Sequence, residues 1–193
     1  MSAVTSTTTS TATPAPPRTA VAHQEAVVTT VSARRALAVL RLAVGFVFLW
    51  AFLVKAFGLG YATPAERAWV AGGQPSQGFL RSDGVQGPAR DVLAGIASPA
   101  TDWLFMLGML AVGTAVLLGI GLRVAAVAGT TIMAMLWLAT WPPTAGSNNP
   151  VVDAHVINAL ALVVLAVTLA GDTWGLGGRL AALPAVRRWT WLR

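Results

Sequence analysis

The chain has 193 residues, of which 55% are hydrophobic and only 10% are charged. About a quarter of the residues of a soluble domain are charged, so this composition argues against a soluble globular protein and favours one that crosses a membrane several times. The absence of cysteine excludes structural disulfides, thiol redox motifs, cysteine-ligated zinc and iron–sulfur clusters. In so apolar a chain, the formal net charge of +6 indicates arginines beside membrane spans and not nucleic-acid binding.

The first 33 residues differ in composition from the rest. Residues 1–17 are rich in Ser, Thr, Ala and Pro and contain no apolar run. Such a segment buries too little apolar surface to offset its conformational entropy, so residues 1–33 are predicted to form a disordered cytoplasmic tail. No charged start followed by an apolar stretch is present, so a signal peptide is not expected.

Four apolar stretches follow, and each is close to the roughly 20 residues that a helix needs to cross a bilayer. They run over residues 36–57, 103–121, 124–141 and 151–170. Helices satisfy their own backbone hydrogen bonds in lipid. The sequence therefore predicts an all-α membrane protein, a bundle of four transmembrane helices within a membrane domain of residues 34–175.

The connections between these stretches are unequal in length. Residues 121–123 alone join the second and third spans, which predicts a tight antiparallel hairpin. Residues 58–102 separate the first two spans, and an insert of this length usually carries function or a small fold of its own. Because Pro64–Val70 and Pro88–Ile96 each begin with proline, a preferred first helical residue, we expect a partly helical extracytoplasmic insert.

The arginines predict the orientation of the chain. With the N-terminus inside, three arginines lie outside and nine inside: Arg18, Arg34, Arg35, Arg41, Arg123, Arg179, Arg187, Arg188 and Arg193. Cytoplasmic loops carry such an excess, which predicts a multi-pass protein of the plasma membrane with both termini cytoplasmic. Residues 176–193 form a basic and aromatic cytoplasmic tail, either an interfacial segment held by anionic lipid or a simple positive tail.

Five residues of the first span share one helical face: Arg41, Gly45, Phe48, Phe52 and Lys55. The two charges lie about 21 Å apart along the axis. One interpretation is a face directed into the bundle, with Lys55 near a cavity on the outer side. The other is that both side chains extend to the two headgroup layers without any further role.

Small residues recur every four positions in the next two spans. Ala111, Ala115 and Gly119 follow this spacing in the second span, and Ala125 and Gly129 follow it in the third. Such stripes allow helices to approach closely in lipid, so both are predicted to be packing surfaces.

The fourth span opens with several polar residues. Asn149 and Pro150 are expected to be its N-cap and first helical residue, which places Asp153 in the first turn or just past it. On a helical wheel Asp153 lies roughly 160° from His155, so an Asp–His pair within the helix is not expected. His155 and Asn158 share a face and are predicted to point inward. The imidazole could relay a proton or bind a quinone carbonyl, or it could simply bond across the bundle.

The insert contains a turn-forming segment, WVAGGQPSQGFLR, at residues 69–81. Its two glycines, proline and small polar residues predict a sharp turn between aromatic anchors. Gly72–Gly73 is not a phosphate-binding loop, because no strand precedes it and no Gly-Lys-Ser/Thr follows. No zinc-ligand spacing occurs in the chain, so no metal site is expected.

Residues 36–180 resemble the DoxX/DoxD family, specifically the DoxD-like membrane subunit of thiosulfate:quinone oxidoreductases. Four features carry the resemblance: Arg41-x3-Gly45 with Lys55, the loop of residues 69–80, the turn Gly119–Arg123, and Asn149-Pro150-x2-Asp153-x-His155 followed by GDTWGLG at 171–177.

The resemblance implies a four-helix membrane protein that oxidises thiosulfate to tetrathionate together with a DoxA-like partner and passes the electrons to quinone. Only about 20 residues follow the fourth span, so the DoxA-like part is expected on a separate subunit. The hypothesis gives catalytic roles to Lys55, His155 and Asn158, and substrate binding to Arg81, Gln74 and Ser76, with quinone as electron acceptor. The alternative is a non-catalytic membrane anchor or assembly subunit of a redox or stress-response complex. A small-solute transporter is a weaker option.

Overall fold

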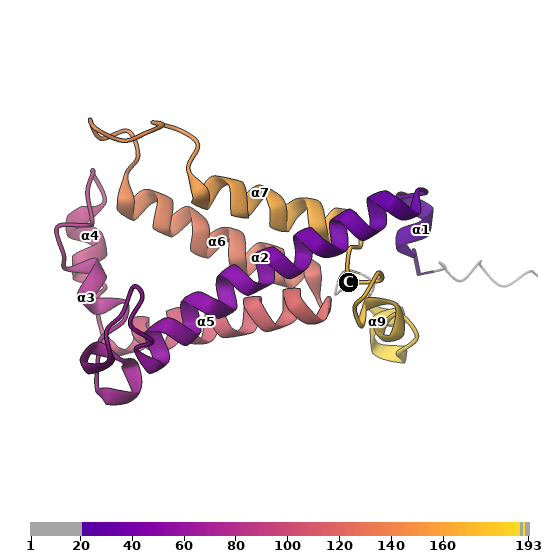
Figure 1. Ribbon diagram of the computed structural model, residues 1–193, viewed down its shortest axis with the longest axis horizontal. Helices are drawn as coiled ribbons and strands as arrows, with labels where there is room; N and C mark the ends of the chain where they lie inside the picture. Colours follow the sequence, from indigo (N-terminus) through magenta and orange to yellow (C-terminus); the bar gives the residue numbers. More distant parts are fainter. Residues whose placement is uncertain (1–20, 190, 192–193) are drawn as a thin grey trace, which may run out of the picture.

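The computed structural model describes residues 21–189 and 191 (Figure 1). Within these residues all regular structure is helical. The order is α1 (Gln24–Val27), α2 (Val31–Phe57), η1 (Ala65–Arg67), η2 (Trp69–Ala71), α3 (Gln77–Leu80), α4 (Arg90–Gly95), α5 (Pro99–Leu118), α6 (Leu122–Thr140), α7 (Ala154–Val167), α8 (Gly177–Leu180) and α9 (Pro184–Arg188). Residues 1–20 of the predicted disordered tail lie outside the described part, and α1 and the first turn of α2 fall within its remainder.

Three helices, α2, α5 and α6, are long and apolar enough to cross a membrane. The fourth expected span corresponds to α7, which is also apolar but has only 14 residues. It is shorter than predicted because the chain is still extended at Asp153, its N-cap, and has a positive φ at Leu169, after its end. The long apolar helices indicate a membrane-embedded protein.

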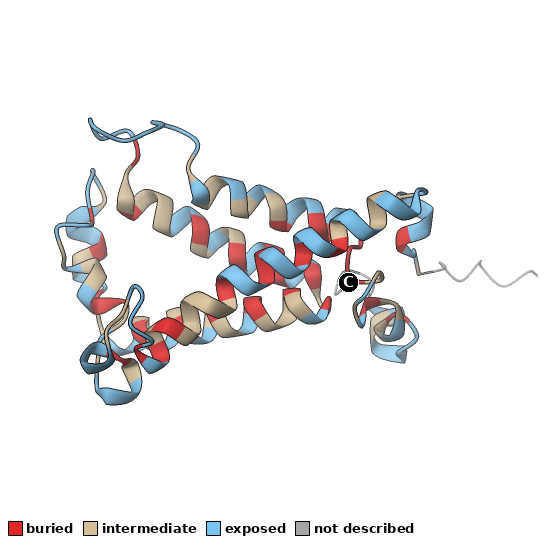
Figure 2. Cartoon of the chain, viewed as in Figure 1, coloured by how far each residue is buried: buried red, intermediate tan, exposed pale blue. Residues whose placement is uncertain are grey.

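The four large helices pack as two pairs, α2 with α5 and α6 with α7, which meet through α5–α6 and α2–α7 contacts (Figure 1). Buried side chains from all four make one core that includes Phe48, Met109, Met133 and Leu162. Figure 2 shows the exposed residues on the outward faces of these helices. Large apolar side chains such as Leu104 and Val127 are among the exposed ones, as expected of a surface that faces lipid.

Close helix approach depends on glycines. A Cβ on Gly113 of α5 would lie 2.6 Å from the Leu49 backbone nitrogen, and one on Gly45 of α2 would lie 2.8 Å from the Leu117 nitrogen. The pairing of α2 with α5 is therefore a backbone-to-backbone contact that larger residues would block.

The predicted small-residue stripes behave differently in the two helices. In α6 the prediction is confirmed, because Ala125 and Gly129 are buried in the core and Gly129 packs against Leu162. In α5 it is wrong for Ala111, which is exposed on the outward face. The α5 contact with α2 instead uses the neighbouring face, which carries Gly113.

The insert lies across one end of the bundle, at the left in Figure 1. Its short helices confirm the partly helical character predicted for it. Val85 and Leu93 bury against Ala139 of α6, and the Gln86 backbone N–H donates to the Ala139 carbonyl at 2.8 Å. We call this end of the bundle the insert end, and the opposite end, with α1, α8 and α9, the basic end.

Candidate functional site

The start of α7 holds a close carboxylate–imidazole pair. Asp153 is the N-cap residue, and its Oδ1 accepts hydrogen bonds from the backbone N–H groups of His155 and Val156 at 2.9 and 3.1 Å. Its Oδ2 lies 2.6 Å from Nδ1 of His155. The expectation that no Asp–His pair forms is wrong, because Asp153 is extended (φ −122°, ψ −171°) and helical-wheel angles apply only inside a helix.

The N-cap expected at Asn149 is also wrong. Asn149 lies in the preceding loop, where its Oδ1 accepts from the backbone N–H groups of Val151 and Val152, both at 2.9 Å. This side-chain turn satisfies the two N–H groups without a helix. The helix therefore starts at Ala154, and Pro150 is not its first residue.

The Asp153–His155 pair is suited to proton transfer. Both side chains are about three-quarters buried, with exposed fractions of 24% and 25%. Nδ1 is held by the carboxylate, while Nε2 has no hydrogen-bond partner among the described residues. A carboxylate that fixes one imidazole nitrogen leaves the other directed at a reacting group, an arrangement common in general acid–base catalysis. Asn158 does not join the pair, because its amide donates to the Ala154 carbonyl of its own helix at 2.8 Å.

Lys55 lies in the last turn of α2 and is partly buried. It makes no hydrogen bond or ion pair with any described residue. In Figure 1 the end of α2 and the start of α7 lie well apart at the insert end. The structure therefore does not bring Lys55 to the Asp153–His155 pair.

Of the three insert residues expected to bind substrate, Ser76 is used to fasten the insert to α5. The buried carboxylate of Asp102, in the first turn of α5, accepts from the Ser76 N–H and hydroxyl at 2.7 and 2.6 Å. It also accepts from the Gln77 N–H and side-chain amide at 3.0 and 2.5 Å. Arg81 donates to the Ala97 carbonyl at 2.7 Å, and Gln74 is exposed.

Asp102 is the residue that sequence reasoning missed at this end. Its four donors come from residues 25 and 26 positions away, so no local pattern identifies them. The one signal in the sequence is that this carboxylate directly precedes the predicted span 103–121. In the structure the helix begins earlier, at Pro99, so Asp102 lies inside it.

At the basic end, Arg41 is completely buried. Its guanidinium donates only to backbone carbonyls in the described part of the chain: those of Val116 (2.8 Å) and Leu117, at the end of α5, and of Ala170 (3.1 Å), Thr173 (3.4 Å) and Trp174 (2.9 Å), after α7. It therefore caps the C-terminus of α5, whose last carbonyls lack partners within the helix, and ties this end to the loop after α7. For Arg41 the bundle-facing interpretation is confirmed, and its extension to the headgroups is wrong.

Glycines make the space for this capping. A Cβ on Gly119 would lie 2.7 Å from the Gly171 Cα, and one on Gly175 would overlap the Gly171 carbonyl oxygen. The α5–α6 turn and the chain after α7 consequently touch through their backbones, with the guanidinium enclosed beside them.

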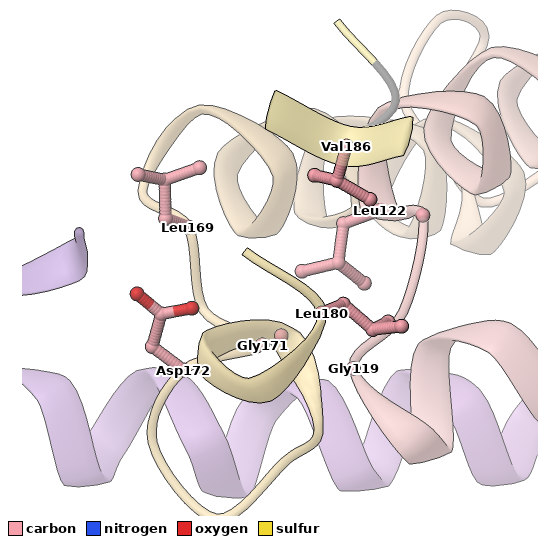
Figure 3. Close-up of a pocket in the computed structure, with 9 residues that line it drawn as sticks. Gly119, Leu122, Leu169, Gly171, Asp172, Leu180 and Val186 are labelled. Atoms are coloured by element: carbon pink, nitrogen blue, oxygen red, sulfur yellow. The ribbon is translucent and has the colours of Figure 1, made fainter. Parts of the chain in front are cut away.

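A small pocket lies next to this contact (Figure 3). Its volume is about 100 Å³, and its side chains come from Leu122, Leu169, Asp172, Leu180 and Val186. Sites for drug-sized ligands occupy about 300–1,000 Å³, so this pocket does not accommodate a quinone. The carboxylate of Asp172, one of the lining residues, also accepts a hydrogen bond from the Gln24 backbone N–H at 2.8 Å and so ties α1 to the bundle.

The described residues contain no group of three or more His, Asp or Glu side chains arranged to hold a metal ion. Comparison of the chain with family models, with curated proteins and with solved structures finds no match.

Proposed function

We propose that four segments cross the plasma membrane, with both termini on the cytoplasmic side. The basic end carries six arginines besides the buried Arg41: Arg34, Arg35, Arg123, Arg179, Arg187 and Arg188. The insert end carries most of the acids: Glu66, Asp83, Asp91, Asp102 and Asp153. This asymmetry supports a cytoplasmic basic end. The 14 residues of α7 rise about 21 Å, and a bilayer can thin locally around a short span.

The absence of native cysteine makes the topology directly testable by single-cysteine labelling. Asn148→Cys lies in the exposed loop before α7, and Ala182→Cys is exposed between α8 and α9. A membrane-impermeant maleimide added to intact cells should label Asn148→Cys, and should label Ala182→Cys only after permeabilisation. The reverse pattern, or labelling of both sites in intact cells, would contradict the proposed topology.

Within this membrane, we propose that the chain is the membrane subunit of a quinone-linked oxidoreductase. The observation that supports it is the Asp153–His155 pair, with Nε2 of His155 unpartnered among the described residues. Reduction of a quinone takes up two electrons and two protons. An imidazolium can donate a hydrogen bond from Nε2 to the quinone carbonyl and transfer that proton to the reduced quinone, which leaves a neutral imidazole. Water returns the proton, and the carboxylate on Nδ1 stabilises the imidazolium.

The resemblance to DoxD-like subunits suggests thiosulfate as the electron donor. Two thiosulfate ions form the central S–S bond of tetrathionate, lose two electrons in total and release no proton. The two protons of the quinol must then come from water, through a group such as His155. Because the chain lacks cysteine, its own thiols cannot carry the electrons. We propose that a DoxA-like or other redox partner subunit brings thiosulfate and its electrons to the membrane subunit.

The test is thiosulfate-dependent reduction of a short-chain quinone in native membranes, where any partner subunit is present. The only two histidines of the chain are His23 and His155, so His23→Ala is a matched control at the opposite end. His155→Ala should lower the rate by about 10²-fold or more, the usual contribution of a general acid or base. His23→Ala should keep the rate of the unmodified chain. Equal rates in both variants would contradict the role of His155.

A non-catalytic membrane anchor is the second candidate. One observation favours it: the two buried charged residues of the described structure, Arg41 and Asp102, bind only groups of the chain itself. Such residues stabilise the fold of the bundle and are not available to a substrate. A partner complex that keeps its full quinone-reducing activity in detergent after removal of this chain would support the anchor and contradict the catalytic proposal.

A further inference from the structure

The last described part of the chain forms a basic and aromatic surface at the basic end. This tail surface consists of exposed side chains from residues 174–189 and 191: Trp174, Arg179, Leu183, Arg187, Arg188, Trp189 and Trp191. The three tryptophans are 53–60% exposed, although tryptophan usually buries its large ring. No Asp or Glu occurs after Asp172, so nothing in this segment neutralises the arginines.

The tail surface is attached to the bundle and is not a free end. The backbone N–H of Leu176 donates to the Leu118 carbonyl at 2.8 Å, and that of Gly177 donates to the Gly171 carbonyl at 3.0 Å. Ala181 is buried. These contacts direct one side of the segment towards the bundle and leave its arginines and tryptophans on the other side.

Apolar packing reinforces this attachment. Leu180 and Val186 face Leu122 across the small pocket (Figure 3). The apolar side chains of α8 and α9 are thus used on the bundle, and the exposed tryptophans need a different apolar surface.

The position of the tail surface along the bundle indicates which apolar surface the tryptophans contact. Helix α5 ends at Leu118, and α6 begins at Leu122, so two membrane-crossing helices terminate beside the tail surface. Exposed Arg123 lies at the same level. The end of a membrane-crossing helix lies among lipid headgroups, where tryptophan is enriched and arginine meets phosphate.

We propose that the tail surface binds anionic phospholipid headgroups of the leaflet at the basic end. The arginines contact the phosphates, and the tryptophans insert at the boundary between headgroups and acyl chains. An acidic protein would match the arginines, but it would not account for three exposed tryptophans next to the bilayer. The inference requires a membrane-embedded bundle and does not depend on quinone chemistry, so either proposal can fail alone.

The test is amide hydrogen exchange of residues 177–189 in the full chain, reconstituted in nanodiscs of phosphatidylglycerol or of phosphatidylcholine. Each arginine near an anionic surface contributes about 1 kcal/mol, so exchange in this segment should be about tenfold slower or more in phosphatidylglycerol. Arg187→Gln/Arg188→Gln should remove most of the difference. The matched control at the insert end, Arg67→Gln/Arg90→Gln, should preserve it. Unchanged exchange within α2 reports that each variant is folded.

Three outcomes would overturn the inference. The first is equal exchange of residues 177–189 in the two lipids, and the second is an equal effect of the control pair. The third uses soluble polyglutamate, added to the chain in phosphatidylcholine discs. If polyglutamate slows exchange as much as phosphatidylglycerol does, the surface binds an acidic protein and not lipid. If the double variant does not fold, the unmodified chain still tests the inference. In about 0.5 M salt, which screens exposed charges, the difference in exchange between the two lipids should disappear.

Discussion

Nδ1 of His155 lies 2.6 Å from Oδ2 of Asp153, and the same carboxylate caps α7 through its other oxygen. One side chain therefore sets both the first turn of the helix and the orientation of the imidazole. Because the cap fixes the carboxylate, the imidazole is held in one orientation, which would lower the reorganisation that the proposed proton transfer needs.

The two roles of Asp153 can be separated by substitution. Asparagine is about as good an N-cap as aspartate, so Asp153→Asn should leave the thermal stability almost unchanged. The neutral amide no longer stabilises an imidazolium, and the rate of quinone reduction should fall at least about tenfold. Asp153→Ala should lose activity and also about 0.5–2 kcal/mol of stability. Thermal melts and quinone absorbance measure the two effects, and full activity in Asp153→Asn would refute the proposed role.

Replacement of Arg41 should destabilise the bundle. Arg41→Met removes the buried guanidinium from carbonyls at the end of α5 and in the loop after α7, with an expected cost of about 3–5 kcal/mol. Arg41→Lys should rescue little, because one ammonium cannot span carbonyls on two elements. The free energy of unfolding in bicelles measures the loss. Arg123→Met, an exposed arginine at the same end, is the control and should change stability by less than about 0.5 kcal/mol.

The glycines around Arg41 lead to a related prediction. Gly171→Ala should destabilise, because the added Cβ would overlap the Gly119 carbonyl, whereas a Cβ on Gly78 of α3 meets no atom within 4 Å. Gly78→Ala should be neutral or stabilise by up to about 1 kcal/mol. Unfolding free energies of the two variants test the contact, and equal values would show that the α5–α6 turn does not touch the chain after α7.

Asp102 should control the attachment of the insert. In Asp102→Asn one acceptor oxygen becomes an amide donor that faces the donors of Ser76 and Gln77. We expect a cost of about 1–3 kcal/mol, concentrated in the insert. Trypsin should cleave after Arg67 and Arg81 faster in this variant than in the unmodified chain. Asp91→Asn, an exposed aspartate in the insert, should leave cleavage unchanged, and equal cleavage in all three proteins would count against the attachment.

The sequence predicted the parts of the fold that follow from local periodicity. Arg41, Gly45 and Phe48 follow one another at spacings of four and three residues, and all three residues are buried in α2. The partners of Arg41 lie 75–133 positions away, and periodicity carries no information about such distances. Its capping role therefore follows only from the packed bundle.

The Asp153–His155 pair was missed for a different reason. Wheel geometry assumes helical dihedrals at both residues, but Asp153 precedes the helix. The N-cap preference of aspartate could have placed the helix start at Ala154, and the side chain would then have been free to reach His155. Competition from Asn149, an equally good cap residue, made the two choices indistinguishable in sequence.

The most direct test of the proposed quinone site is nitrogen-15 NMR of the two histidines in the purified chain in nanodiscs. With only two histidines in the chain, His23→Ala and His155→Ala assign the signals completely. Titration with a short-chain quinone should shift the Nε2 signal of His155 in a saturable way and leave His23 unchanged. A His155 signal that does not respond at any quinone concentration would contradict the central claim that this imidazole binds the quinone.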